Sequence, residues 1–273
     1  MADAAPVVLV TGATSGLGRY LACALAGSGW RVLVHGRDPA RVADLAAELG
    51  GSARGCVADL ASLSDVRDLA TQVRAASPRL DVLVNNAAVG FGAPGEGRQL
   101  SADGHELRFA VNYLAPVLLT RLLVPMVAAS APSRILNIGS IGQAGFDPAD
   151  ARFEHRYNGV EAYRRSKLAL AAFTFDLAEE LRAATVTVNC SHPATLMNTT
   201  MVAQAGITPV STLEQGGEAT VRLITDPALD GVTGQFFDGL ETSRARPEAY
   251  DPQFRARLRE VTGRFLGGAR EDD

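Results

Sequence analysis

Lysine is almost missing from this chain of 273 residues: 26 residues are lysine or arginine, and Lys167 is the one lysine among them. Arginine therefore supplies nearly all of the positive charge. The exception suggests a position that needs a compact ammonium group with three rotatable donors, which a planar guanidinium does not offer. Lys167 is the first candidate for a functional residue.

Cysteine is also scarce, with Cys23, Cys56 and Cys190 as its three positions. Their number is odd, they lie far apart, and each sits in an apolar segment. This pattern argues against a disulfide framework and against a cysteine metal site, and it favours a reducing compartment. We predict no metal site.

Membrane and export signals are lacking as well. No continuous apolar run approaches the roughly 18 residues of a membrane span, and residues 1–6 lack the basic region of a signal peptide. The net charge of -4 gives no electrostatic reason to expect nucleic acid or an anionic membrane as a partner. We therefore expect a cytoplasmic protein that binds neither nucleic acid nor membrane.

The chain does have a regular alternation of short apolar runs and longer helical patterns. The predicted strands are Val7–Thr11, Arg31–His35, Ala53–Ala58, Val82–Asn85, Arg134–Ile138, Thr185–Cys190 and Thr233–Phe237. Helices are predicted at about 17–28, 39–49, 63–76, 101–129, 160–183 and 214–225. Because several strands are apolar throughout, we predict an α/β fold of three layers. It is a doubly wound, seven-stranded parallel sheet with helices on both faces, formed by residues 1–273 as one domain.

The first predicted strand runs into a glycine-rich turn, T-G-A-T-S-G-L-G at residues 11–18. Such a turn lets backbone amides at a helix N-terminus approach a pyrophosphate. Its spacing differs from the commonest fingerprint, and an ordinary tight turn is the alternative. Because it opens a βαβ series, it indicates a Rossmann-type dinucleotide site. The residues expected to line that site are Gly12, Thr14, Ser15, Gly16, Leu17 and Gly18.

The end of the second strand should distinguish the two nicotinamide cofactors. A site for NAD usually has a carboxylate there for the ribose 2′-hydroxyl. The strand ends in His35-Gly36-Arg37, and the nearest acid, Asp38, precedes a proline and suits a helix N-cap. Arg37 could pair with a 2′-phosphate, so we predict NADP(H) over NAD(H), with a solvated surface arginine as the alternative.

Tyr163 and Lys167 are four residues apart in a stretch rich in Ala and Leu, so they lie on one face of a predicted helix. An ammonium group near a phenol favours the phenolate and should lower the tyrosine pKa from about 10. A tyrosine tuned in this way can exchange a proton with a carbonyl or alcohol oxygen. A chance pair on a solvated helix face is the alternative.

Other polar residues follow predicted strands or interrupt a predicted helix. Asn85-Asn86-Ala87-Ala88 follows the fourth strand, and Ser140 follows the fifth, where open α/β sheets bind ligands. Asn112 lies inside a predicted helix, where its side chain competes for backbone hydrogen bonds.

Together these motifs resemble the short-chain dehydrogenase/reductase superfamily over nearly the whole chain. The matching residues are T-G-x-x-x-G-x-G at 11–18, N-N-A-A at 85–88, Asn112, Ser140 and Y-x-x-x-K at 163–167. The resemblance implies a catalytic group in which Tyr163 is the general acid/base and Lys167 lowers its pKa and holds the nicotinamide ribose. Ser140 would bind the substrate oxygen, and Asn112 would anchor a proton relay.

The resemblance further implies an NAD(P)(H)-dependent oxidoreductase acting on a ketone, an aldehyde or a secondary alcohol. Additional cofactor contacts are expected from Asp59, Leu60, Asn86, Ala87, Tyr163, Lys167, Pro193 and Leu196. A same-fold epimerase or dehydratase, and a non-catalytic NADP-binding regulator, are the alternatives.

Two departures from the family pattern stand out. Ala194 follows Pro193 where the family commonly has glycine, which puts the local backbone in question. The neighbouring His192 is more easily explained as a packed residue than as a second acid/base. The long spacing from Ser140 to Tyr163 is similar to the retinol-dehydrogenase-like branch, and its inserted aromatic residues could line an apolar substrate mouth or pin the insertion to the body. They are Phe153 and Tyr157.

Three segments are expected to face the substrate, at about 89–105, 142–160 and 194–213. A lipophilic substrate is suggested by their apolar residues Phe91, Leu196, Met197 and Met201. The tail at about 240–273 predicts an amphipathic helix. A homodimer or homotetramer could form through the surface of Leu168, Leu170, Ala171 and Ala172, unless the insertion covers it.

Overall fold

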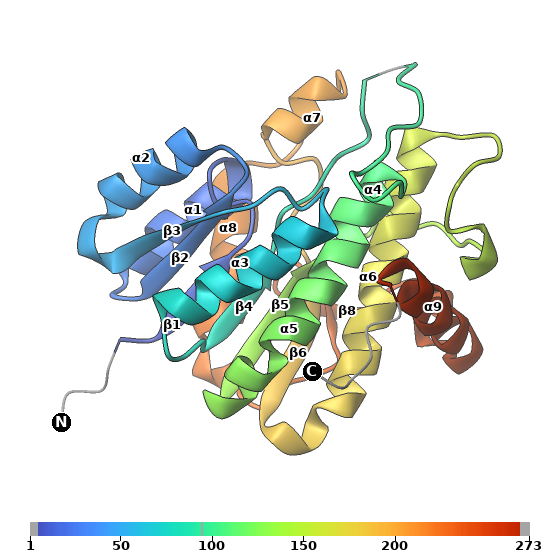
Figure 1. The fold of residues 1–273 in the computed structure, drawn as a ribbon. Coiled ribbons are helices and arrows are strands. Elements are labelled where there is room, and N and C mark those ends of the chain that lie inside the picture. Colours follow the sequence, from blue (N-terminus) through green and yellow to red (C-terminus); the bar gives the residue numbers. More distant parts are fainter. Residues whose placement is uncertain (1–4, 94, 268–273) are drawn as a thin grey trace.

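An eight-stranded sheet forms the centre of the computed structural model, which describes residues 5–93 and 95–267 (Figure 1). Three parts of the chain lie outside the described residues, namely residues 1–4, Pro94 and residues 268–273. They belong to the N-terminus examined for an export signal, the first predicted substrate loop and the predicted tail. The strands are β1 Val7–Val10, β2 Arg31–Gly36, β3 Ala53–Val57, β4 Val82–Asn85, β5 Ser133–Ile138, β6 Val186–His192, β7 Phe236–Asp238 and β8 Glu241–Ser243.

The strand order is β3-β2-β1-β4-β5-β6-β7-β8, and the pairs from β3 to β7 are parallel. The predicted parallel sheet of seven strands is therefore confirmed, with one strand added. Strand β8 pairs antiparallel with β7 in the register Asp238↔Glu241. Its two-residue connection places Gly239 at φ +58°, the left-handed region that tight hairpin turns need.

Helices cover both faces of the sheet (Figure 1). They are α1 Gly16–Gly27, α2 Pro39–Leu49, α3 Leu63–Ala76, α4 Leu107–Phe109, α5 Ala115–Ala129, α6 Gly159–Glu180, α7 Thr200–Gln204, α8 Leu213–Thr225 and α9 Pro252–Phe265. Strand β1 shows why two layers form: all four residues are apolar, with Val7 and Leu9 in the core beneath α3, α5 and α6. Val8 and Val10 belong to the opposite core beneath α1, α2 and α8. A strand buried on both faces needs this composition.

The predicted helix at 101–129 is wrong at its start and is not continuous. It begins at Leu107, because the Glu106 carboxylate accepts a hydrogen bond from the Phe109 amide and so caps the first turn. A π-helical turn at Ala110–Leu114 then separates α4 from α5. Pro116 has no N–H to donate to the carbonyl of Asn112 four residues earlier, so one α-helical hydrogen bond is missing where the π-helical turn meets α5.

The same helical stretch is the most apolar in the described part of the chain. Leu107–Ala129 is long and apolar enough to cross a membrane, with a mean hydropathy of 1.6, but 72% of its most apolar window is buried in this fold. Burial of that kind is typical of a core helix.

The C-terminal segment packs against the insertion that precedes α6. Phe146 meets the rings of Phe153 and Phe254 at 5.6 Å, which joins the insertion to α9. Within the predicted tail, α9 buries Phe254, Leu258 and Val261, whereas Glu241–Ser243 forms strand β8. The surface predicted for dimer contact is not available in that form, because its residues are at most 1% exposed within one chain, namely Leu168, Leu170, Ala171 and Ala172.

Candidate active site

The glycine-rich turn lies at the carboxyl end of β1, where α1 begins. Gly12 has φ +65°, and an added Cβ would lie 2.9 Å from the Cα of Ala87. A Cβ on Gly18 would lie 2.2 Å from the carbonyl oxygen of Gly12. Ser15 is the N-cap of α1, and no hydrogen bond from a described side chain caps this end. The first amides of α1 therefore have the open approach that a phosphate group needs.

Thr11 and Asn86 fasten this turn to the end of β4. The Thr11 hydroxyl accepts hydrogen bonds from the amides of Asn86 and Ala87 at 2.9 and 3.0 Å. The Asn86 side chain donates to the Thr11 carbonyl at 2.8 Å. The predicted residues Asn86 and Ala87 thus shape the cleft, and they also hold β1 and β4 together at the point where the strand order reverses. Open α/β sheets bind their ligands at such a point.

His35 also supports this region, which sequence reasoning did not anticipate. Its Nδ1 accepts a hydrogen bond from the Gly12 amide at 3.1 Å, and its Nε2 lies 3.1 Å from the Ala58 carbonyl. The imidazole is therefore neutral, with its proton on Nε2. Burial lowers the pKa of His35 from 6.5 to about 4. Its position at the end of β2 was the only signal available in the sequence.

Asp38 is committed to the helix that follows β2. Its carboxylate accepts hydrogen bonds from the amides of Ala40 and Arg41 at 2.9 and 3.2 Å and caps α2, as the proline after it suggested. Arg37 is exposed at the rim of the cleft, and Arg41 lies beside it and donates to the Thr14 carbonyl at 3.0 Å. Arg41 was missed in the sequence because it lies inside an apparently solvated helix.

One cleft of about 1790 Å³ collects the residues predicted to contact the cofactor. It runs along the carboxyl ends of the parallel strands and includes the glycine turn, Arg37, and the predicted pair Asp59 and Leu60 after β3. The predicted residues that line it are Gly12, Thr14, Ser15, Gly16, Leu17, Gly18, Arg37, Asp59, Leu60, Asn86, Ala87, Tyr163, Lys167, Pro193 and Leu196. The cleft, the open helix end and the missing Cβ of Gly18 all fit a dinucleotide.

Tyr163, Ser140 and Lys167 meet on the wall of this cleft. The Ser140 side chain hydrogen-bonds with Tyr163, and its oxygen also accepts the Gly142 amide at 2.9 Å. Lys167 Nζ donates to the Ile138 carbonyl at 2.8 Å and lies 5.6 Å from the centre of the Tyr163 ring. Lys167 is 2% exposed, so the chain's one lysine is a buried cation.

The electrostatics of the protein alone differ from the prediction. Burial raises the pKa of Tyr163, and the hydrogen bond from Ser140 offsets part of that rise. The Lys167 ammonium group donates to the Ile138 carbonyl and not to the Tyr163 hydroxyl, and it lies 5.6 Å from the centre of the Tyr163 ring. Burial in turn lowers the pKa of Lys167 to about 8. In the absence of other groups, Tyr163 is therefore a protonated donor.

The side chain of Asn112 forms hydrogen bonds to two segments beside the site. Its side-chain oxygen accepts the Val89 amide at 2.7 Å, and its nitrogen donates to the Val89 carbonyl and to Ser166 Oγ, both at 3.0 Å. The side chain of Asn112 thus connects the loop after β4 with α6. Pro116, four residues after Asn112, has no N–H to donate to the main-chain carbonyl of Asn112.

The end of β6 and the segment after it contain the two positions that depart from the family pattern or stand next to that departure, His192 and Ala194. Ala194 takes an ordinary backbone conformation, whereas Leu196 adopts φ +46°. The unusual geometry predicted next to Pro193 therefore falls two residues later. His192 lies against Thr195, with its Nε2 3.1 Å from the hydroxyl, and burial lowers its pKa. This contact fits a packed residue at the cleft.

The apolar residues predicted for the substrate side line the same cleft, and the ring of Phe91 lies beside that of Tyr163. The rings of Phe91 and Tyr163 are 4.6 Å apart and nearly perpendicular. Of the two inserted aromatic residues considered for the substrate mouth, Phe153 is 2% exposed and packs on Phe109, so it pins the insertion. Tyr157 lines the cleft and also hydrogen-bonds to Arg108.

Comparison with known proteins identifies the family to which this chain belongs. Human retinol dehydrogenase 14 is 33% identical over an alignment covering 95% of this chain and 86% of its own length. The crystal structure of an uncharacterized protein from Mycobacterium paratuberculosis superposes with a TM-score of 0.78 at 27% identity, covering 97% of this chain and 96% of that one.

A second solved structure, the RhlG/NADP active-site complex of Pseudomonas aeruginosa, superposes with a TM-score of 0.71 at 28% identity and covers 86% of this chain and 95% of that one. The family model of the short chain dehydrogenases matches residues 6–208. The cleft and its residues are thus those of an NAD(P)-dependent oxidoreductase, and the chain belongs to the short-chain dehydrogenase family, in its retinol-dehydrogenase-like branch.

Proposed function

We propose that this protein is an NADP(H)-dependent carbonyl reductase or alcohol dehydrogenase acting on a lipophilic ketone, aldehyde or secondary alcohol. The observation that carries the proposal is the meeting of Tyr163, Ser140 and Lys167 on the wall of the cleft that begins at the glycine turn. A bound nicotinamide would supply the hydride acceptor or donor.

Tyr163 is proposed as the general acid/base. Its hydroxyl is protonated and bound to Ser140, so it can give its proton to a carbonyl oxygen or take one from an alcohol. Ser140 supplies a second hydrogen bond to the same substrate oxygen, which polarises it. Lys167 is a buried cation beside them, and it stabilises the phenolate that Tyr163 becomes after donating its proton.

The preference for NADP(H) rests on two arginines and one occupied acid. Arg37 and Arg41 line the rim of the cleft after β2, where a 2′-phosphate would lie. The Asp38 carboxylate caps α2, because its Oδ1 accepts the amides of Ala40 and Arg41, so this acid already has a structural role. Replacing Arg37 by alanine should raise the Kd for NADPH by about tenfold or more while leaving that for NADH nearly unchanged.

A lipophilic substrate is supported by the apolar lining of the cleft and by the relative that is named a retinol dehydrogenase. The lining on this side includes Phe91, Leu196, Met197 and Met201. All-trans-retinal is therefore a suitable first substrate probe. A cytoplasmic location, the absence of a membrane partner, and a homodimer or homotetramer stay predictions from the sequence.

The decisive experiment compares Tyr163→Phe with Tyr20→Phe, a matched change on α1 that does not touch the cleft. NADPH oxidation with retinal and with simple ketones is followed at equal cofactor saturation. Tyr163→Phe should lower kcat by at least about 10²-fold, because the proton donor is gone. Normal turnover in this variant would refute the assignment. Conversion of substrate without net NADPH oxidation would instead favour an epimerase or dehydratase.

A further inference from the structure

A buried arginine at the start of α4 holds the substrate side of the cleft. Arg108 is 1% exposed. Its Nε donates to the carbonyl of Gly90 at 2.8 Å, and one terminal nitrogen donates to the carbonyl of Phe91 at 3.1 Å. The other terminal nitrogen donates to the hydroxyl of Tyr157 at 2.7 Å. One guanidinium thus connects the segment after β4 with the insertion before α6.

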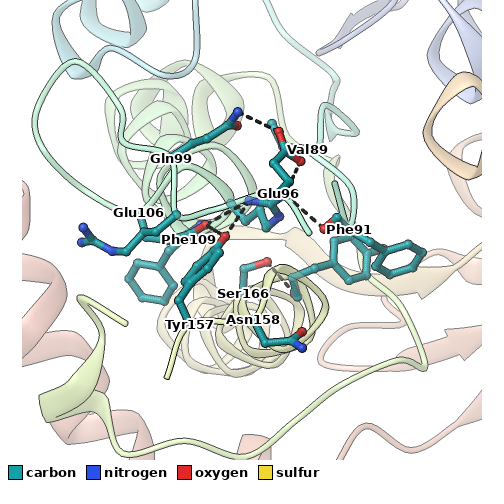
Figure 2. A network of polar contacts seen from close by, with 12 residues as sticks. Val89, Phe91, Glu96, Gln99, Glu106, Phe109, Tyr157, Asn158 and Ser166 are labelled. Carbon is teal, nitrogen blue, oxygen red and sulfur yellow. Dashed lines mark hydrogen bonds and ion pairs between the residues drawn. The ribbon is translucent and has the colours of Figure 1, made fainter. Parts of the chain in front are cut away.

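Two carboxylates form ion pairs with the Arg108 guanidinium. Glu106 is fully buried, and its Oε1 lies 3.4 Å from Nη1 of Arg108. Oε2 of Glu96 lies 3.4 Å from Nη2 of Arg108. Tyr157 donates to Glu106 at 2.9 Å, so it bridges the arginine and the acid. Figure 2 shows Glu96, Glu106 and Tyr157 converging beside α6. All donors of the guanidinium have acceptors, as a buried cation requires.

Two glycines allow the chain to approach this arginine. Gly92 has φ +83°, and an added Cβ would lie 2.3 Å from a terminal nitrogen of Arg108. A Cβ on Gly159 would lie 2.5 Å from the carbonyl oxygen of Phe91. Both substrate-side segments are therefore closely fitted around the guanidinium, and this contact is not a surface ion pair.

The backbone fixed in this way carries residues of the substrate pocket. Phe91 places its ring 4.6 Å from that of Tyr163. Gly90 lies against α7, since an added Cβ would be 2.3 Å from the Cγ of Met201. The position of both residues depends on carbonyls that Arg108 binds directly.

We propose that Arg108 is a positioning residue: it fixes the backbone at Gly90 and Phe91 and so holds the Phe91 ring against Tyr163, where the ring limits the size of the carbonyl substrate. The selectivity part of this inference rests on the proposed function. The positioning part rests on the contacts alone. Arg108 has no contact with the cofactor turn, so its effect should separate from cofactor binding.

The test uses five variants of the full chain, one of them a control. Phe91→Ala removes the ring, and Arg108→Met removes the guanidinium. The double variant tests whether both substitutions act through the position of the Phe91 ring. Tyr157→Phe removes one hydroxyl and leaves every charge paired, which keeps the test valid if Arg108→Met does not fold. Arg98→Met is the matched control, because Arg98 also links the two segments, through the Arg152 carbonyl, without touching Gly90 or Phe91.

The enzymatic readout is the ratio of kcat/KM for all-trans-retinal to that for hexanal with NADPH. Phe91→Ala and Arg108→Met should each raise the ratio by about tenfold, and Tyr157→Phe should raise it by a smaller factor. In the double variant the ratio should equal that of Phe91→Ala, since Arg108 acts through the ring. The Kd for NADPH should stay within about twofold of that of the wild type in all variants.

Hydrogen exchange of the peptide around residues 86–93 supplies a second readout that needs no turnover. Arg108→Met and Tyr157→Phe should speed exchange there, and Arg98→Met should not. Unchanged exchange and an unchanged ratio in Tyr157→Phe and Arg108→Met would overturn the inference, as would independent, multiplicative effects of Arg108→Met and Phe91→Ala. A wild-type protein without turnover on any carbonyl would refute the proposed function, and the exchange data would still decide the positioning role.

Discussion

Lowering the pH from 7 to 5 should destabilise this protein through one residue of the cofactor cleft, His35. The imidazole is neutral in the folded chain, because its Nδ1 accepts the Gly12 amide and its Nε2 donates to the Ala58 carbonyl. A second proton would occupy Nδ1 and leave the Gly12 amide facing a donor. Burial opposes that proton and lowers the pKa of His35 to about 4, although the nearby Asp59 carboxylate acts in the other direction.

The sign and size of this change in stability follow from the difference between the pKa of His35 in the folded chain and in the unfolded chain. The unfolded chain binds a proton at His35 with a pKa of 6.5, whereas the folded chain does so only near pH 4. Stability from this group is therefore fully present above pH 6.5 and is lost as the pH falls toward 4. The full difference corresponds to about 3 kcal/mol, of which about 2 kcal/mol is lost between pH 7 and pH 5.

Urea unfolding at the two pH values measures this change. His35→Asn is the matched variant, because the amide keeps an acceptor for Gly12 and has no group that titrates in this range. Subtracting its pH dependence removes the contributions of the other histidines, including His105 and His192, whose pKa values are also lowered by burial. Equal pH dependence in the wild type and His35→Asn would refute the reasoning.

The remaining predictions concern the cofactor turn, the lysine and the C-terminal helix. Gly18→Ala should raise the Kd for NADPH at least about tenfold, because its Cβ would meet the Gly12 carbonyl at 2.2 Å, while the control Gly27→Ala in the same helix has open space and should bind normally. Lys167→Arg should weaken NADPH binding and turnover together, since the buried ammonium lies beside Tyr163 and a planar guanidinium cannot reproduce its compact charge; loss of only one of these would correct that picture. Tyr113→Phe should lower the free energy of unfolding by about 1 kcal/mol, because its hydroxyl bonds Thr262 of α9 at 2.7 Å in a buried position, and an equal loss in a Thr262→Val background would contradict this.

Local sequence patterns were enough to predict the sheet and the reacting pair. A parallel strand covered on both faces must be apolar throughout, as Val7–Val10 is, so its position is visible in the sequence. Tyr163 and Lys167 lie one helical turn apart, and this spacing needs no tertiary information. The same holds for Asp38, whose following proline predicted the cap that the structure has.

Features that depend on distant partners could not be predicted in this way. The sequence prediction placed Glu106 and Arg108 inside a helix at 101–129, whereas the structure begins the helix at Leu107 and buries both side chains. Both are buried because Tyr157, about 50 residues later, completes their pairing. The role of His35 depends likewise on Gly12 and Ala58, which are far away in the chain. A pattern with a period of a few residues carries no information about such contacts.

The two halves of the cleft should therefore differ in what they tolerate. The cofactor half is built from backbone contacts between strand ends, such as the approach of Gly18 to the Gly12 carbonyl, where an added methyl group has no space. The substrate half is held by side chains around Arg108, and its apolar lining residues stand on loops that this network fixes. Changes to lining residues that leave the network intact can alter the shape of the pocket without disturbing the sheet. Substrate preference in this chain should accordingly be easier to change at Phe91 than cofactor binding is at the glycine turn.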